Sequence, residues 1–285
     1  MSLVEKAMAK SRGEVARKPA ARAGEAAPPP IERLPVAQPQ IQLTEELLRT
    51  AGLYAPETMP HQFAAECRRI RRRLLADSAG QAAGSSEVMQ VTSVMAGEGK
   101  TFAAFHLAMS LIKGTDLSVL LIDADPARPR LSRALGVDDR VGLMDAATSA
   151  QNDVEDLVLS TNITGLSVLP VGRRDALVTD SFGGHLIRET IGRLRGRQGR
   201  LIVVDSPPLL QTTEALELTA YATTVLLVVR AGKTPRAAVS EALKQLADHP
   251  RVMVLLNGVE PPLFGKSVGY GFDYYDYSDY APSGR

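Results

Sequence analysis

The sequence predicts an α/β fold in which a doubly wound, mostly parallel sheet is flanked by helices. Short apolar runs rich in β-branched residues end near positions 94, 124, 169, 205, 230 and 256. Helical patterns separate these runs, for example at 182–194, 213–221 and 237–247. Alternating strands and helices are typical of a parallel sheet that is covered on both faces. A chain of 285 residues with 45% hydrophobic content can bury a core of that size.

A glycine-rich segment, Ala96-Gly97-Glu98-Gly99-Lys100-Thr101, lies between the first apolar run and a helical pattern. A strand, a glycine-rich loop and a helix in this order are typical of the P-loop of nucleotide enzymes. The glycines allow a tight turn, and the start of the helix favours an anion. Lys100 would reach the β and γ phosphates, while the Thr101 hydroxyl would complete the shell of a Mg²⁺ ion. We therefore expect a site for ATP and Mg²⁺ on this loop.

The loop departs from the full P-loop pattern at one position. Val94 stands where a glycine, six residues before the lysine, is usual. A glycine-rich turn that merely begins a buried helix is therefore an alternative interpretation, and other segments must decide between the two.

Two further apolar runs end in acidic residues, one at Asp123 and Asp125 and the other at Asp205. In a doubly wound sheet, ligands bind beyond the carboxyl ends of the strands, so these aspartates are expected beside the nucleotide. Crowding raises the pKa of one of two neighbouring carboxylates, whereas a nearby Mg²⁺ lowers it. Such a pair can divide into a metal ligand and a base. The alternative is that both aspartates cap the next helix or start a turn.

In the order of these motifs the sequence resembles the bacterial tyrosine autokinases, whose P-loop fold is unrelated to that of eukaryotic protein kinases. The resemblance runs from about Pro60 to Pro262 and rests on segments 97–101, 121–125, 203–208, 228–234 and 255–259. The first ten residues are similar to the N-terminal residues of the subgroup whose genes lie beside exosortase-linked exopolysaccharide loci. One departure is Ala127, where the family usually has an arginine; Arg128 follows it.

The resemblance implies an ATP-dependent protein tyrosine kinase that phosphorylates its own C-terminal tyrosines between subunits and regulates exopolysaccharide synthesis or export. It implies Lys100, Asp123 and Asp125 as catalytic residues, with Lys100 neutralising the transferring phosphoryl group and Asp123 taking the tyrosine proton. Mg²⁺ is expected on Thr101, Asp125 and Asp205. The expected nucleotide contacts are Ala96, Gly97, Glu98, Gly99, Lys100, Thr101 and Asn257, the last of which would touch the adenine base.

The C-terminus carries the expected phosphate acceptors, five of the seven tyrosines in the chain: Tyr270, Tyr274, Tyr275, Tyr277 and Tyr280. Interleaved glycine, serine and aspartate leave no apolar face, so the sequence predicts a mobile segment that can enter a neighbouring active site. A stacking platform for nucleic acid is the alternative, but the aspartates between the rings would repel phosphates.

A Glu-x-x-Arg-x-x-Arg pattern is formed by Glu66, Arg69 and Arg72. In the family that the chain resembles, this pattern supports oligomers, so we expect a homo-oligomer, in a ring. The arginine-rich run 68–73 could instead contact nucleic acid or an anionic membrane. A formal net charge of +1 gives the chain no basic excess, and we expect no nucleic-acid partner.

Composition divides the chain into four parts: a short N-terminal helix at 1–10, a disordered Ala/Pro-rich linker at 11–40, a P-loop kinase domain at 41–264 and a flexible tyrosine-rich tail at 265–285. No apolar run reaches the roughly 18 residues that a membrane span needs. The single cysteine, Cys67, suits the cytosol. We expect a cytoplasmic protein recruited to the plasma membrane by a partner. The resemblance implies a membrane-embedded polysaccharide co-polymerase adaptor and a cognate tyrosine phosphatase.

Two other functions remain open at this point. A positioning ATPase of the plasmid-partition type would share the fold, but those proteins place a second lysine where this chain has Met95. A nucleotide-binding switch with weak catalysis is the other, and Val94 and Ala127 are its support.

Overall fold

A computed structural model describes residues 40–78, 87–113, 117–148, 153–173, 185–195 and 200–259 of the chain. The expected N-terminal helix, the linker up to residue 39 and the five tail tyrosines lie outside the described residues.

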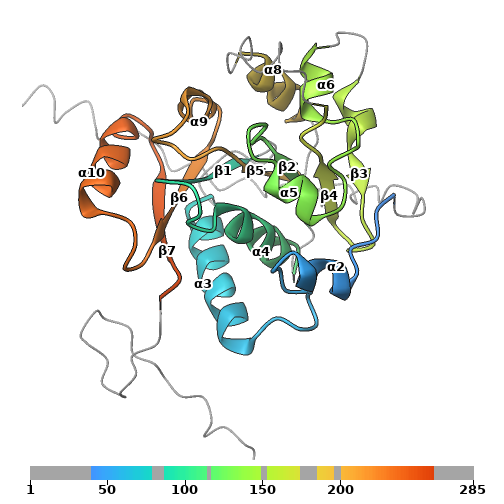
Figure 1. The fold of residues 1–285 in the computed structure, drawn as a ribbon, viewed down its shortest axis with the longest axis horizontal. Helices are drawn as coiled ribbons and strands as arrows, with labels where there is room; N and C mark the ends of the chain where they lie inside the picture. Colours follow the sequence, from blue (N-terminus) through green and yellow to red (C-terminus); the bar gives the residue numbers. More distant parts are fainter. Residues whose placement is uncertain are drawn as a thin grey trace, which may run out of the picture. The chain divides into compact units, whose positions relative to one another are not determined.

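Among the described residues, seven strands form one sheet in the order β3-β4-β2-β5-β1-β6-β7 (Figure 1). The strands are β1 Val88–Ser93, β2 Ser118–Asp123, β3 Leu159–Ser160, β4 Leu166–Leu169, β5 Arg200–Asp205, β6 Thr224–Arg230 and β7 Val252–Asn257. Every neighbouring pair is parallel except β3 and β4, which are antiparallel. The mostly parallel, doubly wound sheet predicted from the sequence is therefore confirmed. The two-residue strand β3 is too short to give a sequence pattern.

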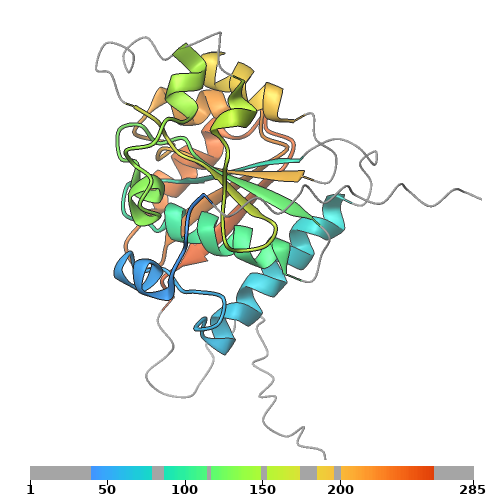
Figure 2. The same cartoon turned by 90° about the vertical axis from the view of Figure 1, so that its right-hand side faces the viewer.

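Helices cover both faces of the sheet. They are α2 Glu45–Thr50, α3 His61–Ser78, α4 Lys100–Ile112, α5 Arg130–Ala134, α6 Leu143–Thr148, the 3₁₀ helix η1 Val154–Leu157, α8 His185–Leu194, α9 Thr213–Thr219 and α10 Arg236–Gln245. One apolar core joins α2 to α5 with one face of the sheet, and two others join the remaining helices with the opposite face. Figure 2 shows the sheet between these layers.

Helix α4 is buried along most of its length, from Ala103 to Leu111. It packs between the sheet on one side and α3 on the other, so almost every side chain meets protein. A helix in such a position is apolar all round rather than amphipathic. The helix begins at Lys100, so its packing also fixes the end of the predicted phosphate loop.

Helix α3 contacts the C-terminal end of α4. The Arg71 guanidinium donates hydrogen bonds to the backbone carbonyls of Ser110 and Lys113, at the C-terminal end of α4. These carbonyls have no partner within the helix, so a guanidinium is a favourable cap there. No helix within the described ranges combines the length and the apolar composition that crossing a bilayer would take.

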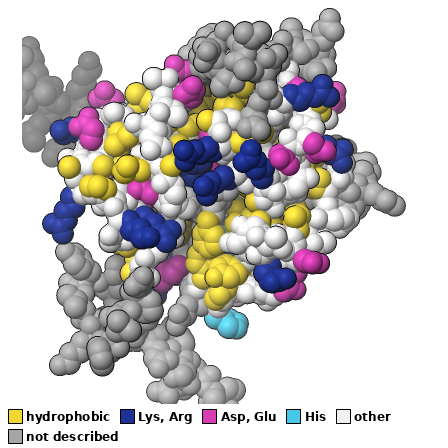
Figure 3. Space-filling model, viewed as in Figure 1, with side chains coloured by type: hydrophobic (Ala, Val, Ile, Leu, Met, Phe, Trp, Pro, Cys, Tyr) yellow, Lys and Arg dark blue, Asp and Glu magenta, His cyan; other side chains and the backbone are white. Residues whose placement is uncertain are grey.

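Acidic, basic and apolar side chains are interspersed on the molecular face seen in Figure 3. This distribution agrees with the nearly balanced counts of 33 Lys and Arg against 32 Asp and Glu.

A buried histidine ties the segment before α3 to α4. His106 is 1% exposed and packs among the rings of Tyr54, Phe63 and Phe102. Its Nε2 accepts a hydrogen bond from the Tyr54 backbone N–H at 3.0 Å, so Nδ1 carries the proton and donates to the Phe102 carbonyl at 2.8 Å. Burial lowers the pKa of His106 to about 4.

His106 should therefore make a negative contribution to stability on mild acidification. The unfolded chain binds a proton on His106 near pH 6.5, whereas the folded chain resists it down to about pH 4. At this residue the unfolded state holds more protons between these values, so the contribution of His106 to stability falls as the pH decreases, by roughly 3 kcal/mol in all. Urea unfolding of the wild type and His106→Gln at several pH values measures the difference in slope. His61→Gln, at an exposed position, controls for the loss of an imidazole, and equal slopes in all three proteins would contradict the prediction.

Candidate nucleotide site

The phosphate loop follows β1, which lies between β5 and β6 near the middle of the sheet. Asp205 ends β5 and Asp123 ends β2, and these two residues are register partners across the parallel pair. The carboxyl ends of the three strands therefore bring the loop and both aspartates to one edge of the sheet. This edge is the usual place for a ligand in a doubly wound fold.

The two glycines of the loop have backbone conformations that other residues rarely adopt. Gly97 has φ of 85° and Gly99 has φ of 94°. A Cβ atom at Gly99 would in addition lie 2.2 Å from the Asn257 side-chain nitrogen. Glycine is needed at both positions because it alone reaches this region without steric cost.

The departure at Val94 has a structural explanation. Its side chain is fully buried in the core between the sheet and α10, and its N–H donates to the Val228 carbonyl at 3.3 Å. Val94 thus extends the contact of β1 with β6, and the glycine-dependent turn begins only at Gly97. The neighbouring Met95 is 40% exposed.

Lys100 lies among the three predicted aspartates. Its ammonium nitrogen is 2.8 Å from an Asp125 oxygen and 3.6 Å from an Asp205 oxygen. Burial lowers the pKa of Lys100, but the carboxylates of Asp205, Asp125 and Asp123 outweigh it and the net shift is upward. The lysine is therefore a permanent buried cation at the start of α4, where a helix already favours anions.

Several oxygen atoms in this cluster suit a hydrated cation. The Thr101 hydroxyl and both carboxylate oxygens of Asp205 are buried and have no hydrogen-bond partner among the described residues. Lys100 offsets part of the Asp205 charge from 3.6 Å, but burying polar atoms without hydrogen bonds is costly, and Mg²⁺ prefers oxygen ligands from hydroxyl, carboxylate, water and phosphate. Together with the Asp125 carboxylate, these atoms fit the Mg²⁺ site expected from the sequence.

Asp123 is held by three hydrogen bonds. One oxygen accepts from the backbone N–H and the hydroxyl of Ser132, at 2.8 and 2.7 Å, and the other accepts from the Asp125 N–H at 3.1 Å. Burial, together with the nearby Asp205, raises the pKa of Asp123 to about 7 despite these bonds. A carboxylate with a pKa near the working pH is suited to accept and release a proton.

Ser132 is a site residue that the sequence did not reveal. It is fully buried in the first turn of α5, and its hydroxyl also accepts from the Val171 N–H at 3.0 Å, just beyond β4. A lone serine nine residues after an aspartate is too common to signal this role.

Side chains of β1 hold the segment that follows Asp205. The Thr92 hydroxyl donates to the Pro207 carbonyl at 2.7 Å, and the Gln90 amide donates to the Ser206 hydroxyl and the Ala215 carbonyl at 3.0 and 2.7 Å. These bonds set the position of Asp205 relative to the phosphate loop. Polar residues inside a buried strand were a signal available in the sequence.

Asn257 lies against the phosphate loop. Its side-chain nitrogen donates to the Glu98 carbonyl at 2.8 Å, and its oxygen accepts from the Gly258 N–H at 2.9 Å. The adenine contact expected for Asn257 stays a prediction. Arg128 is exposed, and its backbone N–H donates to an Asp125 oxygen at 2.9 Å.

The predicted oligomer residues lie on the exposed side of α3. Glu66, Arg69 and Arg72 are all exposed, and Glu66 pairs with Arg69 at 3.1 Å. Cys67 and Leu74 are buried on the other side. The three residues are therefore accessible to a partner.

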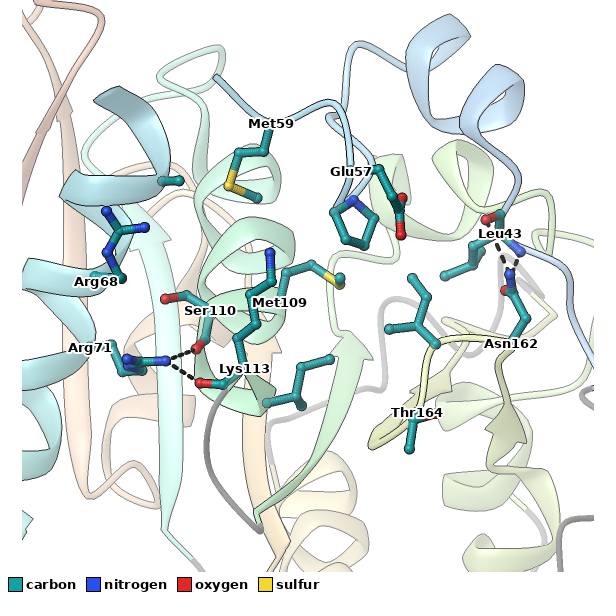
Figure 4. Close-up of a pocket in the computed structure, with 14 residues that line it drawn as sticks. Leu43, Glu57, Met59, Arg68, Arg71, Met109, Ser110, Lys113, Asn162 and Thr164 are labelled. Atoms are coloured by element: carbon teal, nitrogen blue, oxygen red, sulfur yellow. Dashed lines mark hydrogen bonds between the residues drawn. The ribbon is translucent and has the colours of Figure 1, made fainter. Parts of the chain in front are cut away.

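A cavity of about 670 Å³ lies at the other end of α4 from the phosphate loop (Figure 4). It is lined among others by Met59, Arg68, Arg71, Met109 and Lys113. The axis from Lys100 to Ile112 is about 18 Å long at 1.5 Å per residue, so this cavity is separate from the nucleotide site.

No family model matches the chain. Among curated proteins, it is 28% identical over 252 residues to EpsB of Ralstonia nicotianae, which is named as a tyrosine-protein kinase. The match covers 87% of this chain and 33% of that protein. The chain thus spans about a third of the length of that relative.

Solved structures are similar to the chain in fold. The kinase domain of VpsO is 28% identical, with a TM-score of 0.58 over 69% of this chain and 96% of that one. The kinase domain of the Escherichia coli tyrosine kinase ETK is 22% identical, with a TM-score of 0.60 over 73% and 80%. A ParA-family ATPase from Chlorobium tepidum shares the fold, at 15% identity and a TM-score of 0.51 over 60% and 74%. In sequence and in fold, the chain is similar to P-loop tyrosine kinases of bacteria.

Proposed function

We propose that this protein is an ATP-dependent protein tyrosine kinase that phosphorylates its own C-terminal tyrosines. The observation that carries the proposal is the buried cluster in which Lys100 lies between Asp125 and Asp205, directly after a phosphate loop. Phosphoryl transfer needs positioning and charge stabilisation more than covalent chemistry, and this cluster can supply both.

Each member of the cluster has a distinct role in the proposal. Lys100 neutralises charge on the transferring phosphoryl group. Thr101, Asp125 and Asp205 would hold Mg²⁺, which would supply positive charge against the phosphate oxygens. Asp123, fixed in orientation by Ser132, accepts the proton of the attacking phenol.

The acceptor in the proposal is the tyrosine cluster of another copy of the chain. Five of seven tyrosines lie within the last 16 residues, at 270, 274, 275, 277 and 280. Tyr54, outside this cluster, packs against the His106 ring and is not expected to reach the site. Phosphorylation adds up to two negative charges per tyrosine and would weaken binding of the tail to a carboxylate-lined site. Release of the tail would then follow from its own modification.

Mass spectrometry of the purified protein after incubation with ATP and Mg²⁺ tests the proposal. Phosphotyrosine on the tail supports it. Inorganic phosphate in solution without phosphotyrosine would instead support a positioning ATPase, whose fold the ParA-family structure shares. Nucleotide binding with neither product would support a switch with weak catalysis.

The chain should assemble through the exposed side of α3. We expect Glu66, Arg69 and Arg72 to contact a second copy, because all three are exposed. The triple change to alanine should yield a monomer on light scattering. Changing Glu241 and Lys244, an exposed pair of the same spacing on α10, to alanine controls for loss of surface charge. Unchanged mass of the triple variant would contradict the assignment.

The resemblance of the sequence to the bacterial tyrosine autokinases also supports a proposal about the pathway, the location and the partners of the kinase. The protein would regulate exopolysaccharide synthesis or export from the inner face of the plasma membrane. It would be recruited by a membrane-embedded co-polymerase adaptor and reset by a cognate tyrosine phosphatase. Co-purification of the protein with membranes only when that adaptor is present would support this setting.

A further inference from the structure

Glu98 is a buried carboxylate inside the phosphate loop for which the proposed chemistry gives no use. Its side chain is turned into the protein, and the residue is 4% exposed. One oxygen accepts from the Met95 N–H at 2.9 Å, and the other accepts from the Thr234 hydroxyl. A carboxylate repels phosphate, so its presence in this loop requires a reason other than contact with the nucleotide.

Thr234 connects Glu98 to the loop between β6 and α10. Its hydroxyl donates to Glu98 and at the same time accepts from the Arg230 N–H at 2.9 Å, at the end of β6. The hydroxyl therefore stands in a chain of hydrogen bonds that runs from the β6 backbone to the phosphate loop. A charged acceptor strengthens such a chain.

The end of β7 meets the same residue from another direction. The Asn257 side-chain amide donates to the Glu98 backbone carbonyl at 2.8 Å. The Asn257 backbone carbonyl accepts from the Ala231 N–H at 2.9 Å. Thr234 is 136 residues from Glu98 in the sequence and Asn257 is 159 residues from it, yet both form hydrogen bonds with Glu98. The β6–α10 loop and the end of β7 therefore both hold the phosphate loop in place, and we call these contacts the brace.

We propose that Glu98 is a positioning residue for nucleotide binding, and that Thr234 holds its carboxylate so that the phosphate loop is fixed against the β6–α10 loop and the end of β7. This inference rests on the nucleotide-binding part of the proposed function. A loop held in one shape before the nucleotide arrives binds it with a smaller loss of conformational freedom. Without the brace, each binding event must also order the loop.

The pair Thr234→Val and Thr234→Ser gives a matched test. Valine keeps the shape of threonine and removes the hydroxyl, whereas serine keeps the hydroxyl and removes a methyl group. Affinity for MgADP, measured by isothermal titration on the full chain, should fall about tenfold in Thr234→Val, as expected for loss of a hydrogen bond to a charged group. Thr234→Ser should stay within about twofold of the wild type.

A purely structural role for Thr234 would give a different result. The melting temperature without nucleotide would then fall in Thr234→Val while the affinity of the folded protein for MgADP stayed at the wild-type value, and that result would overturn the inference. If the wild type itself binds no MgADP, the proposed function fails as a whole. Wild-type binding with equal affinity in both threonine variants removes only the role of Glu98.

A second variant approaches the brace from the other side. Glu98→Gln keeps the side-chain volume but removes the charge and one of the two acceptor oxygens, so it should also weaken MgADP binding. If both residues act through the same brace, the double variant Glu98→Gln with Thr234→Val should bind little more weakly than the weaker single variant. Fully additive losses would mean that the two residues act independently, against the inference.

Discussion

Lys100→Met should abolish tyrosine phosphorylation of the tail, with a loss of at least about a hundredfold. Methionine fills nearly the same space but carries no charge to neutralise the transferring phosphoryl group. The variant also leaves the carboxylates of Asp125 and Asp205 without the cation they share, so it should be less stable than the wild type. Phosphotyrosine is quantified by mass spectrometry after incubation with ATP and Mg²⁺, and circular dichroism verifies that the variant is folded.

Lys113→Met is the matched control for this experiment. Lys113 directly follows the last residue of the same helix α4, at its opposite end, and is exposed. Its loss should leave tail phosphorylation near the wild-type level. Retained phosphotyrosine in a folded Lys100→Met protein would refute the role of Lys100 and, with it, the proposed cluster.

Asp123→Asn should reduce the rate of transfer by roughly 10²- to 10⁴-fold, the usual contribution of a general base. An amide does not accept a proton at neutral pH, whereas the Asp123 carboxylate has a pKa of about 7 in the folded protein. The amide would also place one N–H₂ group against the donors of Ser132 or Asp125, which costs about 1–3 kcal/mol of stability. Single-turnover kinetics of tail phosphorylation measures the rate.

Binding of MgADP separates the two consequences of this change. Because Asp123 has no assigned contact with the nucleotide, the affinity of Asp123→Asn should stay within a few fold of the wild type while transfer is lost. Asp139→Asn, an exposed aspartate beyond α5, controls for the change of acid to amide. A rate near that of the wild type would exclude Asp123 as the base.

Local sequence patterns were sufficient to predict the sheet and the phosphate loop. Apolar runs predicted the strand ends that carry Asp123 and Asp205, since a buried parallel strand must be apolar along its whole length. Glycines 97 and 99 predicted a tight turn in the loop, and both have a positive φ in the structure. The aspartates lie at the same edge because all parallel strands of one sheet end there, but their closeness depends on the neighbouring positions of β2, β5 and β1.

The remaining parts of the site depend on contacts that no local pattern contains. Ser132 was not predicted, because its hydrogen bonds to Asp123 depend on the path of the chain between β2 and α5. Glu98 was expected only as part of the loop, and its tie to Thr234 requires β6 to lie beside β1. The bond from the Asn257 amide to the loop was not predicted either, because it requires the end of β7 to lie beside the loop; the contact of Asn257 with the adenine base stays a prediction.

The sequence by itself determined which chemical groups the protein carries at the sheet edge: a lysine, a hydroxyl and three carboxylates after buried strands. Strand pairing, helix packing and the path of the chain after β2 decided the orientation of these groups, because contacts such as Lys100 with Asp205 and Thr234 with Glu98 form only when the sheet is assembled. The tertiary structure therefore decided that Lys100 lies between two aspartates and that Asp123 is held by Ser132. It also decided that Glu98 faces the protein and braces the loop.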